Sequence, residues 1–264
     1  MDIFWIRVFL SFIIGGIYIA LSLFMAERFG SRIGGLIVGL PSTSVVSLFF
    51  IGITQGIDTV ASATTLMPLS LAAISIFIAV FFKLQNNGLY KALAISFLVW
   101  LGISLPLAIY HIENIWYSTL ACLIIYLSVF FYFKQVPDRK STKTSSTKIE
   151  FFTRAILSGF IIALAVVMSK YLGPLWGGLI ATIPITTASS IFLLYHKQGA
   201  EFTGSVITSI QRALAPSIVF VLAAHFLVQA YGIISGLIFS YIIAVISAIV
   251  LYQFVLTSKN RIQT

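Results

Sequence analysis

The sequence predicts an all-α polytopic membrane protein with about nine transmembrane helices, arranged as two four-helix repeats of inverted topology and a linker helix. Of its 264 residues, 59% are hydrophobic and 9% are charged, whereas a soluble domain carries about 25% charged residues. The apolar residues form long runs, so lipid is the expected solvent for most of the chain. One apolar stretch with a central proline also occurs twice, at a constant offset of 143 residues, as from Gly34 to Gly177.

A membrane-spanning helix needs roughly 20 apolar residues. Because lipid offers no hydrogen-bonding partner, the backbone of each run must satisfy itself, and each run is therefore expected to be a helix. The first run is too long for a signal peptide and is predicted to be a retained helix. The nine predicted spans are Ile3–Met25, Ile33–Ile53, Thr59–Phe82, Leu89–Tyr110, Ile115–Phe133, Ile149–Met168, Leu175–Tyr195, Thr203–Val228 and Ile233–Leu256.

The repeat divides the chain into a first four-helix unit over residues 1–112, a linker region over 113–148 and a second four-helix unit over 149–264. Spans one to four match spans six to nine without gaps, and span five has no partner. Its single extra crossing inverts the second unit relative to the first, which is a construction found in secondary transporters. The polar segment Lys134–Lys148 that follows span five is rich in Ser, Thr and Lys and is the predicted flexible linker.

The net charge of +9 does not indicate a nucleic-acid partner. Most Lys and Arg residues stand at the ends of apolar runs, where membrane topology places them, and no basic stripe with interleaved aromatic residues occurs elsewhere. If the basic linker is cytoplasmic, almost all loop cations fall on the same side, with Lys170 as the exception. We therefore predict a multi-pass protein of the cell inner (plasma) membrane with its N-terminus outside and its C-terminus in the cytoplasm.

Two short elements recur in both units. The first is G-L-I-x-x-x-P, at Gly35–Pro41 and again at Gly178–Pro184. The second is a turn of the form Q-G-x-acid, at Gln55–Asp58 and again at Gln198–Glu201. Chance similarity between apolar segments does not readily align prolines, glycines and a polar turn at one offset, so a duplication is the favoured explanation.

On these elements each unit resembles the GlpM family of small bacterial inner-membrane proteins. The resemblance covers most of each unit and omits span five. It implies a membrane-embedded helical fold and a chain that looks like a tandem fusion of two such units. In that family the turn has an Arg-Gly-Ile-Glu character. This sequence has Gln55 and Gln198 in place of the Arg, and its first copy has Asp58 in place of the Glu. The function of that family is not established, so the resemblance implies no activity.

Hydroxyl side chains follow both central prolines. A proline inside a helix removes a backbone hydrogen bond, and nearby hydroxyls can satisfy the freed carbonyl. Alternatively, two broken helices cross at the membrane centre and line a polar substrate site, with half-helix N-termini offering partial positive charge to an anion. The predicted substrate-binding residues of this kind are Pro41, Ser42, Thr43, Ser44, Ser47, Pro184, Thr186, Thr187, Ser189 and Ser190.

Arg212 is the remaining candidate for the substrate site. It stands about ten residues into the eighth span, where an ionised residue costs at least roughly 2.5–3.5 kcal/mol and should face a cavity or a partner. Snorkelling of its side chain to the cytoplasmic face is the alternative. Asp58 and Glu201 each follow a glycine turn. Capping of the next helix is favoured for both carboxylates over a role in gating.

The favoured function is a transporter or permease that moves a small solute, anionic if Arg212 faces it, through a central site between the repeats. The alternative is a membrane scaffold or regulator of an envelope-assembly complex that transports nothing. We predict no enzyme activity, because paired acids, a Ser–His couple or a metal set at membrane depth are not found at good spacing. The lone Cys122 matches no metal motif, so we predict no metal and no other cofactor. The predicted partners are the lipid bilayer and an unidentified solute, and glycines in G-x-x-x-G spacing allow a homo-oligomer.

Overall fold

The computed structural model describes residues 2–28, 40–111, 113–134 and 147–262, and every regular element in these ranges is helical. The start of the predicted second span, at 33–39, and most of the predicted flexible linker, at 135–146, lie outside the described residues. The helices are α1 Ile3–Arg28, α3 Ser42–Gln55, α4 Ile57–Leu84, the short 3-10 helix η1 Gln85–Asn87, α5 Leu89–Ile109, α6 Ile115–Lys134, α7 Lys148–Leu172, α8 Pro174–Ala181, α9 Ile185–Arg212, α10 Ala215–Tyr231 and α11 Ile233–Ile262.

The chain is a multi-pass membrane protein by the length and composition of its helices. Within the described residues, eight segments are long and apolar enough to cross a bilayer, and α3 is a shorter apolar helix. The prediction of an all-α membrane protein is therefore confirmed. One of the eight segments runs from Pro174 to Gly204 and includes α8 and the first part of α9. This segment extends nine residues beyond the predicted end of the seventh span at Tyr195.

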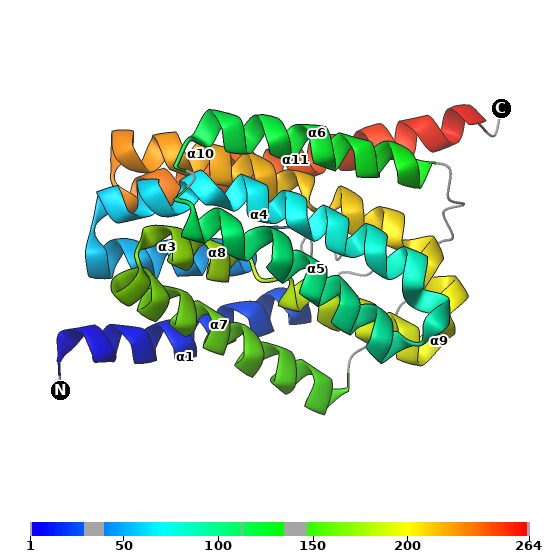
Figure 1. Cartoon of the computed structure of the whole chain (residues 1–264), viewed down its shortest axis with the longest axis horizontal. Coiled ribbons are helices and arrows are strands. Elements are labelled where there is room, and N and C mark those ends of the chain that lie inside the picture. Colours follow the sequence, from blue (N-terminus) through cyan, green and yellow to red (C-terminus); the bar gives the residue numbers. More distant parts are fainter. Residues whose placement is uncertain (1, 29–39, 112, 135–146, 263–264) are drawn as a thin grey trace.

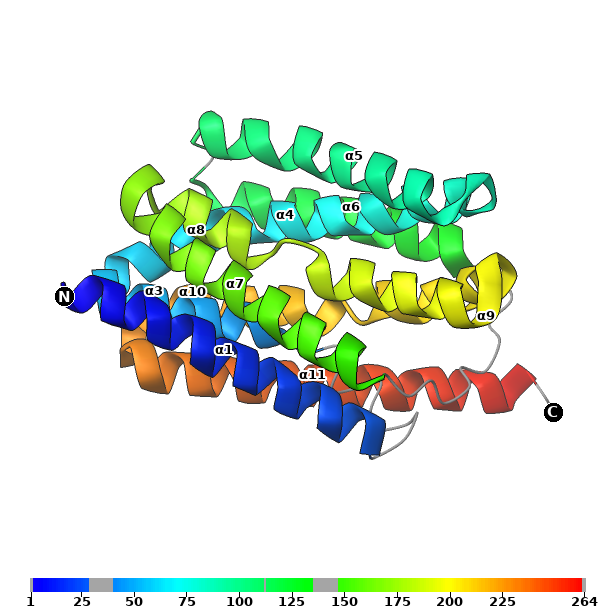
Figure 2. The ribbon, with the colours of Figure 1, turned by 90° about the horizontal axis from the view of Figure 1, so that it is seen from below.

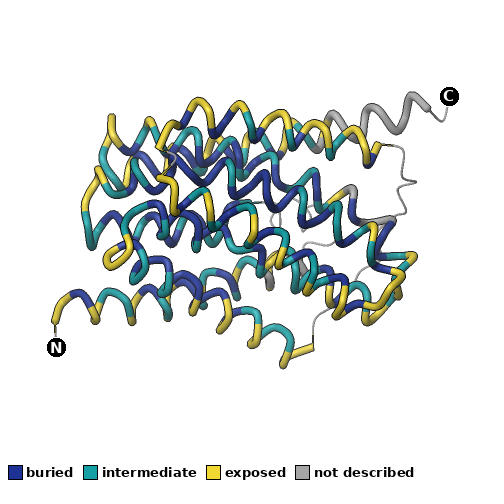
Figure 3. The backbone as a smooth tube through the Cα atoms, in the orientation of Figure 1, coloured by how far each residue is buried: buried dark blue, intermediate teal, exposed yellow. Residues whose placement is uncertain are grey.

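Helix α4 forms the centre of the bundle (Figure 1). It packs against α5, α6, α8 and α10, and it is the most buried of the eight candidate spans. Figure 3 shows the buried residues concentrated along α4 and exposed residues on the outer helices. Large apolar side chains on those outer faces, such as Phe9, Leu98, Phe160 and Ile246, are exposed, as expected for a surface covered by lipid.

Consecutive long helices run back and forth along the long axis of the molecule (Figures 1 and 2). Helix α1 begins at one end of this axis and α11 ends at the opposite end. Helices α1 and α7 lie side by side and run in opposite directions. The chain thus starts its first long helix from one end of the bundle and starts α7 from the other.

A break, rather than a kink, occurs at Pro184, and Pro41 likewise stands directly before a helix. Pro41 and Pro184 precede the first residues of α3 and α9, with φ and ψ of −77° and 55° for Pro41 and −75° and 41° for Pro184. Of the two alternatives for the central prolines, a kinked helix and a broken one, Pro184 has the break, because α8 ends at Ala181 and α9 begins at Ile185. The physical reason is that the residue before a proline avoids the helical conformation, so the helix stops before it.

The backbone follows closely similar paths after Pro41 and after Pro184. The amide of Ser42 donates to the Leu40 carbonyl at 2.8 Å, and the amide of Ile185 donates to the Ile183 carbonyl at 2.7 Å. Fourteen residues of α3 then lead to Gly56, at φ 99° and ψ 175°, and α9 breaks at Gly199, at φ 81° and ψ 176°. Both glycines adopt a positive φ that other residues rarely tolerate, which explains a glycine at both turns.

Helices α1 and α7 make close backbone contact through glycines. A Cβ atom on Gly159 would lie 2.5 Å from the Phe12 carbonyl oxygen, and one on Gly16 would lie 3.2 Å from the Ala155 carbonyl oxygen. The two contacts are reciprocal, because Gly16 and Phe12 stand at the same offset from Gly159 and Ala155. Small residues at such crossings allow membrane helices to approach closely.

Thr182 connects the second break to α4. Its Oγ1 atom lies 2.6 Å from Ser70 Oγ and 2.8 Å from the Leu179 carbonyl oxygen, and both side chains are buried. The amides of Thr182 and Ile183 donate to the carbonyls of Leu179 and Ile180. The carbonyl groups at the end of α8 are therefore satisfied by the break itself, as a buried helix end requires.

Thr182→Val is expected to lower the free energy of unfolding by about 0.5–2 kcal/mol, because it leaves the buried Ser70 hydroxyl without its partner in the break. Titration with a denaturing detergent, followed by circular dichroism, measures the change. Thr182→Ser keeps the hydroxyl and should retain most of the stability. Equal stability of the parent and Thr182→Val would show that the contact contributes nothing.

Candidate functional site

A cavity of about 60 Å³ lies where α1, α3, α7 and α9 meet. Its walls are formed by the second half of α1, the first residues of α3, the first half of α7 and the first residues of α9. Space of this size holds a few water molecules or one small ion and is far below the roughly 300–1,000 Å³ of a pocket for a drug-sized molecule. The lining residues are Ile19, Ser22, Leu40, Ser42, Thr43, Arg154, Ser158, Thr186, Ser189 and Ser190.

The structure brings half of the predicted proline-associated residues together at this cavity. Ser42 and Thr43 of α3 line it from one side, and Thr186, Ser189 and Ser190 of α9 line it from the other. Thr43 and Thr186 are related by the offset of 143 residues and each is the second residue of its helix. The sequence repeat and the tertiary structure therefore converge on the same hydroxyl residues.

The other predicted residues lie beside the cavity without lining it. Pro41 and Pro184 are buried at the breaks. Ser44 and Ser47 are buried inside α3, and the Ser47 hydroxyl has no hydrogen-bond partner within the described part of the chain. Thr187 is half-buried. These side chains border the site but do not face the open space.

Some of the hydroxyls satisfy backbone carbonyls, as the simpler interpretation of the sequence expects. Ser189 and Ser190 both donate to the Thr186 carbonyl, at 3.1 Å and 2.7 Å, and Ser22 donates to the Tyr18 carbonyl at 2.9 Å. Such bonds leave the lone pairs of each hydroxyl oxygen available to a further donor. Local hydrogen bonding and a role in lining the cavity are thus compatible for these residues.

Arg154 is the charged residue of the cavity wall, and sequence reasoning did not select it. Its Nη2 atom lies 3.4 Å from Ser190 Oγ, which joins α7 to the start of α9. Arg154 stands six residues into α7, about 9 Å along the helix from Lys148. The available signal was an arginine inside a predicted span, since such residues normally face a cavity or a partner.

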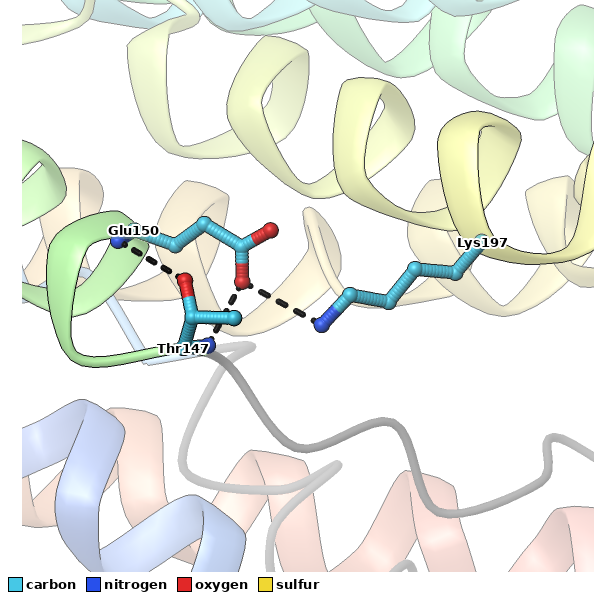
Figure 4. A network of polar contacts seen from close by, with 3 residues as sticks. All are labelled: Thr147, Glu150 and Lys197. Carbon is cyan, nitrogen blue, oxygen red and sulfur yellow. Dashed lines mark hydrogen bonds and ion pairs between the residues drawn. The ribbon is translucent and has the colours of Figure 1, made fainter.

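The acidic residue one turn before Arg154 is engaged elsewhere. Glu150 Oε2 lies 3.2 Å from Lys197 Nζ of α9 and accepts the backbone amide of Thr147 at 2.6 Å (Figure 4). The Thr147 hydroxyl in turn accepts the Glu150 amide at 3.3 Å, which completes a capping box at the start of α7. The Glu150 carboxylate is therefore neutralised by Lys197 rather than directed to Arg154, and the pair connects α7 to α9 beyond the cavity.

Helices α3 and α9 both begin at the cavity. Neither α3 nor the start of α9 has a side-chain cap, so their first amide groups lack intrahelical partners. Each helix start carries a partial positive charge of about half an elementary unit. These helix starts therefore place partial positive charge at the cavity wall, which Arg154 also lines.

The remaining predicted residues lie away from the cavity. Arg212 is the last residue of α9 and is not among the lining residues. The helix that it ends packs against α6. Asp58 is exposed in the first turn of α4, where a carboxylate favours the helix dipole. Glu201 is also exposed and follows the turn at Gly199.

The first half of the chain is similar to an uncharacterised protein family. No curated protein matches the chain, and no solved structure matches it. A family model described as "Protein of unknown function (DUF3147)" matches residues 8–115. The match begins within α1, at residue 8, continues to the end of α5 and stops at the first residue of α6. Over this part, the chain is similar to DUF3147, a family of unknown function.

Proposed function

We propose that the chain is a membrane transporter that moves a small solute through the cavity between α1, α3, α7 and α9. The observation that carries the proposal is the composition of the cavity wall. It is lined by polar residues at the starts of α3 and α9, from parts of the chain that are 143 residues apart. Broken helices whose N-termini face a central polar site are the substrate-binding device of several transporter folds.

We also propose that the two halves are inverted-topology repeats that arose by duplication of a four-helix unit similar to the GlpM family. Three observations support this. Pro41 and Pro184, which precede α3 and α9, share their backbone geometry. The glycine contacts between α1 and α7 are reciprocal, and these two helices run in opposite directions (Figure 2). Helix α6 then provides the odd crossing, with the N-terminus outside and the C-terminus in the cytoplasm of a bacterial-type inner membrane.

Cysteine accessibility tests the transport proposal. Cys122 is the only cysteine of the chain and is buried, so Cys122→Ala supplies a silent background. Thr43→Cys and Thr186→Cys then place one thiol on each side of the cavity. Because a thiol reacts with a charged, membrane-impermeant reagent only where water reaches it, the reagent is applied separately to right-side-out and inverted vesicles.

A transporter exposes its central site to each side in turn, so both cysteines should be labelled from both faces of the membrane. Leu98→Cys is the matched control, because Leu98 is exposed on the outer face of α5 and should meet lipid and remain unlabelled. Labelling of Thr43→Cys and Thr186→Cys from one face only, or from neither, would reject alternating access. That result would favour the scaffold or regulator function.

A further inference from the structure

We propose that one end of the bundle binds the headgroups of anionic phospholipids through Lys83, Lys91 and Lys134. These three residues define the lysine end of the molecule. The inference uses the multi-pass helical fold and the charges at its ends, and it does not involve the cavity. It therefore holds whether or not the chain transports a solute.

The three lysines stand at helix ends that meet at one end of the long axis. Lys83 is the next-to-last residue of α4, Lys91 is the third residue of α5 and Lys134 is the last residue of α6. Figures 1 and 2 show these helix ends together, with the turn of α9 beside them. All three side chains are exposed. Because each one stands at the end of an apolar span, its amine is expected at the level of the lipid headgroups.

An aromatic residue directly precedes each of these lysines, and its ring helps to hold the helix ends together. The centroid of the Phe82 ring lies 5.3 Å from that of Phe133, which joins α4 to α6. The Tyr90 ring of α5 lies 6.2 Å from the Phe192 ring of α9. The lysines are therefore presented by a packed surface, and the exposed Tyr90 has the amphipathic ring that is typical of the headgroup level.

The amines of the lysine end have no partner within the described part of the chain, in hydrogen bonds or in ion pairs. The carboxylates nearby are engaged elsewhere. Glu150 is bound to Lys197 and to the amide of Thr147, and Glu201 also has a contact within the chain. Three unpaired positive charges on one face attract an anionic surface, and each adds to the attraction when it lies near the headgroups.

The opposite end of the bundle differs, because the protein itself engages cations there. The Arg7 guanidinium donates to the carbonyl of Ile53, and the Lys170 amine lies 3.7 Å from the centroid of the Phe4 ring. Three acidic residues also belong to this end, namely Asp2, Asp58 and Glu113. The attraction for anions is therefore specific to the lysine end.

Apolar surface beside the lysines favours a lipid over a soluble anion. Leu98 stands seven residues after Lys91, and Leu127 stands seven residues before Lys134. Each leucine thus lies about 10 Å along its helix from a lysine, and both side chains are exposed. A phospholipid can place its phosphate at the amines and its acyl chains along these apolar faces, whereas a free phosphate would gain only the first contact.

Thermal unfolding of the purified full chain in a neutral detergent at fixed ionic strength tests the proposal. One series adds phosphatidylglycerol to the micelles, a second adds phosphatidylcholine with the same acyl chains, and a third adds sodium glycerol phosphate, which has no chains. We expect phosphatidylglycerol to raise Tm in a saturable manner and by more than the other two. The apparent affinity for it should fall by about fivefold for each of Lys83→Gln, Lys91→Gln and Lys134→Gln.

Two further variants show whether charge at this end is the cause. Lys170→Gln removes a cation from the opposite end and should keep the parent affinity, and a variant with arginine at all three positions should also bind. Equal shifts with phosphatidylglycerol and phosphatidylcholine, or an undiminished shift when all three lysines are glutamine, would overturn the proposal. An equal shift with glycerol phosphate would overturn the assignment to lipid, and an equal loss in Lys170→Gln would overturn the assignment to the lysine end.

Discussion

Gly178→Ala is expected to be among the most destabilising single-methyl changes in this protein, with a loss of about 1–3 kcal/mol or more in the free energy of unfolding. Gly178 is buried in α8, where that short helix packs against α4. An added Cβ atom would overlap the Ala63 carbonyl oxygen and would lie 2.9 Å from the Ala63 carbonyl carbon. Both obstacles are backbone atoms in the most buried helix, so neither can move aside without shifting α4 or α8.

Gly102→Ala is the matched control for this prediction. Gly102 lies within α5, and an added Cβ atom there meets no heavy atom within 4 Å. Alanine is a better helix former than glycine by about 0.5–1 kcal/mol, so this variant should equal or exceed the parent in stability. Unfolding of both variants in a denaturing detergent measures the difference. A Gly178→Ala protein as stable as Gly102→Ala would mean that α8 does not approach α4 as closely as described.

Arg154→Gln is expected to reduce solute flux by about tenfold or more, since the loss of a charged hydrogen bond to the ligand costs about 1.5–3 kcal/mol. Arg154 is the cationic side chain that lines the cavity. Uptake of small radiolabelled solutes, both anionic and neutral, by liposomes that contain the purified protein provides the measurement. Arg154→Lys keeps the charge but loses the planar fork, and an intermediate flux is expected.

Arg212→Gln separates this effect from a general loss of positive charge. Arg212 is also a partly buried arginine of the second half, but it ends α9 near Tyr126 rather than at the cavity. The solute flux of the Arg212→Gln variant should stay close to that of the parent protein. If Arg212→Gln lost flux and Arg154→Gln kept it, the pathway would run beside α6 and the assignment of the cavity would be wrong.

The contrast between these two arginines shows where sequence reasoning ended. Depth along a span can be counted, and Arg212 was selected because it stands far from both ends of its predicted span. Depth does not say which neighbour a side chain meets. Arg212 is the last residue of α9, away from the cavity, whereas Arg154, nearer to the end of its span, lines the cavity because α7 crosses the start of α9.

Composition and apolar length alone were enough to predict the lipid-embedded helical character, and the repeated proline marked where α3 and α9 begin. These properties depend on short-range physics: apolar length, the restriction that proline imposes on the preceding residue, and glycine at positive φ. Thr43 and Thr186 follow these prolines in the sequence and line the cavity, but their role in a site stays a prediction. The choice of α1 and α7 as the helices that complete the wall, with Ser22, Arg154 and Ser158, could be learned from the folded chain alone. That choice depends on how closely backbones can approach at Gly16 and Gly159, a property of two helices together and of neither sequence segment alone.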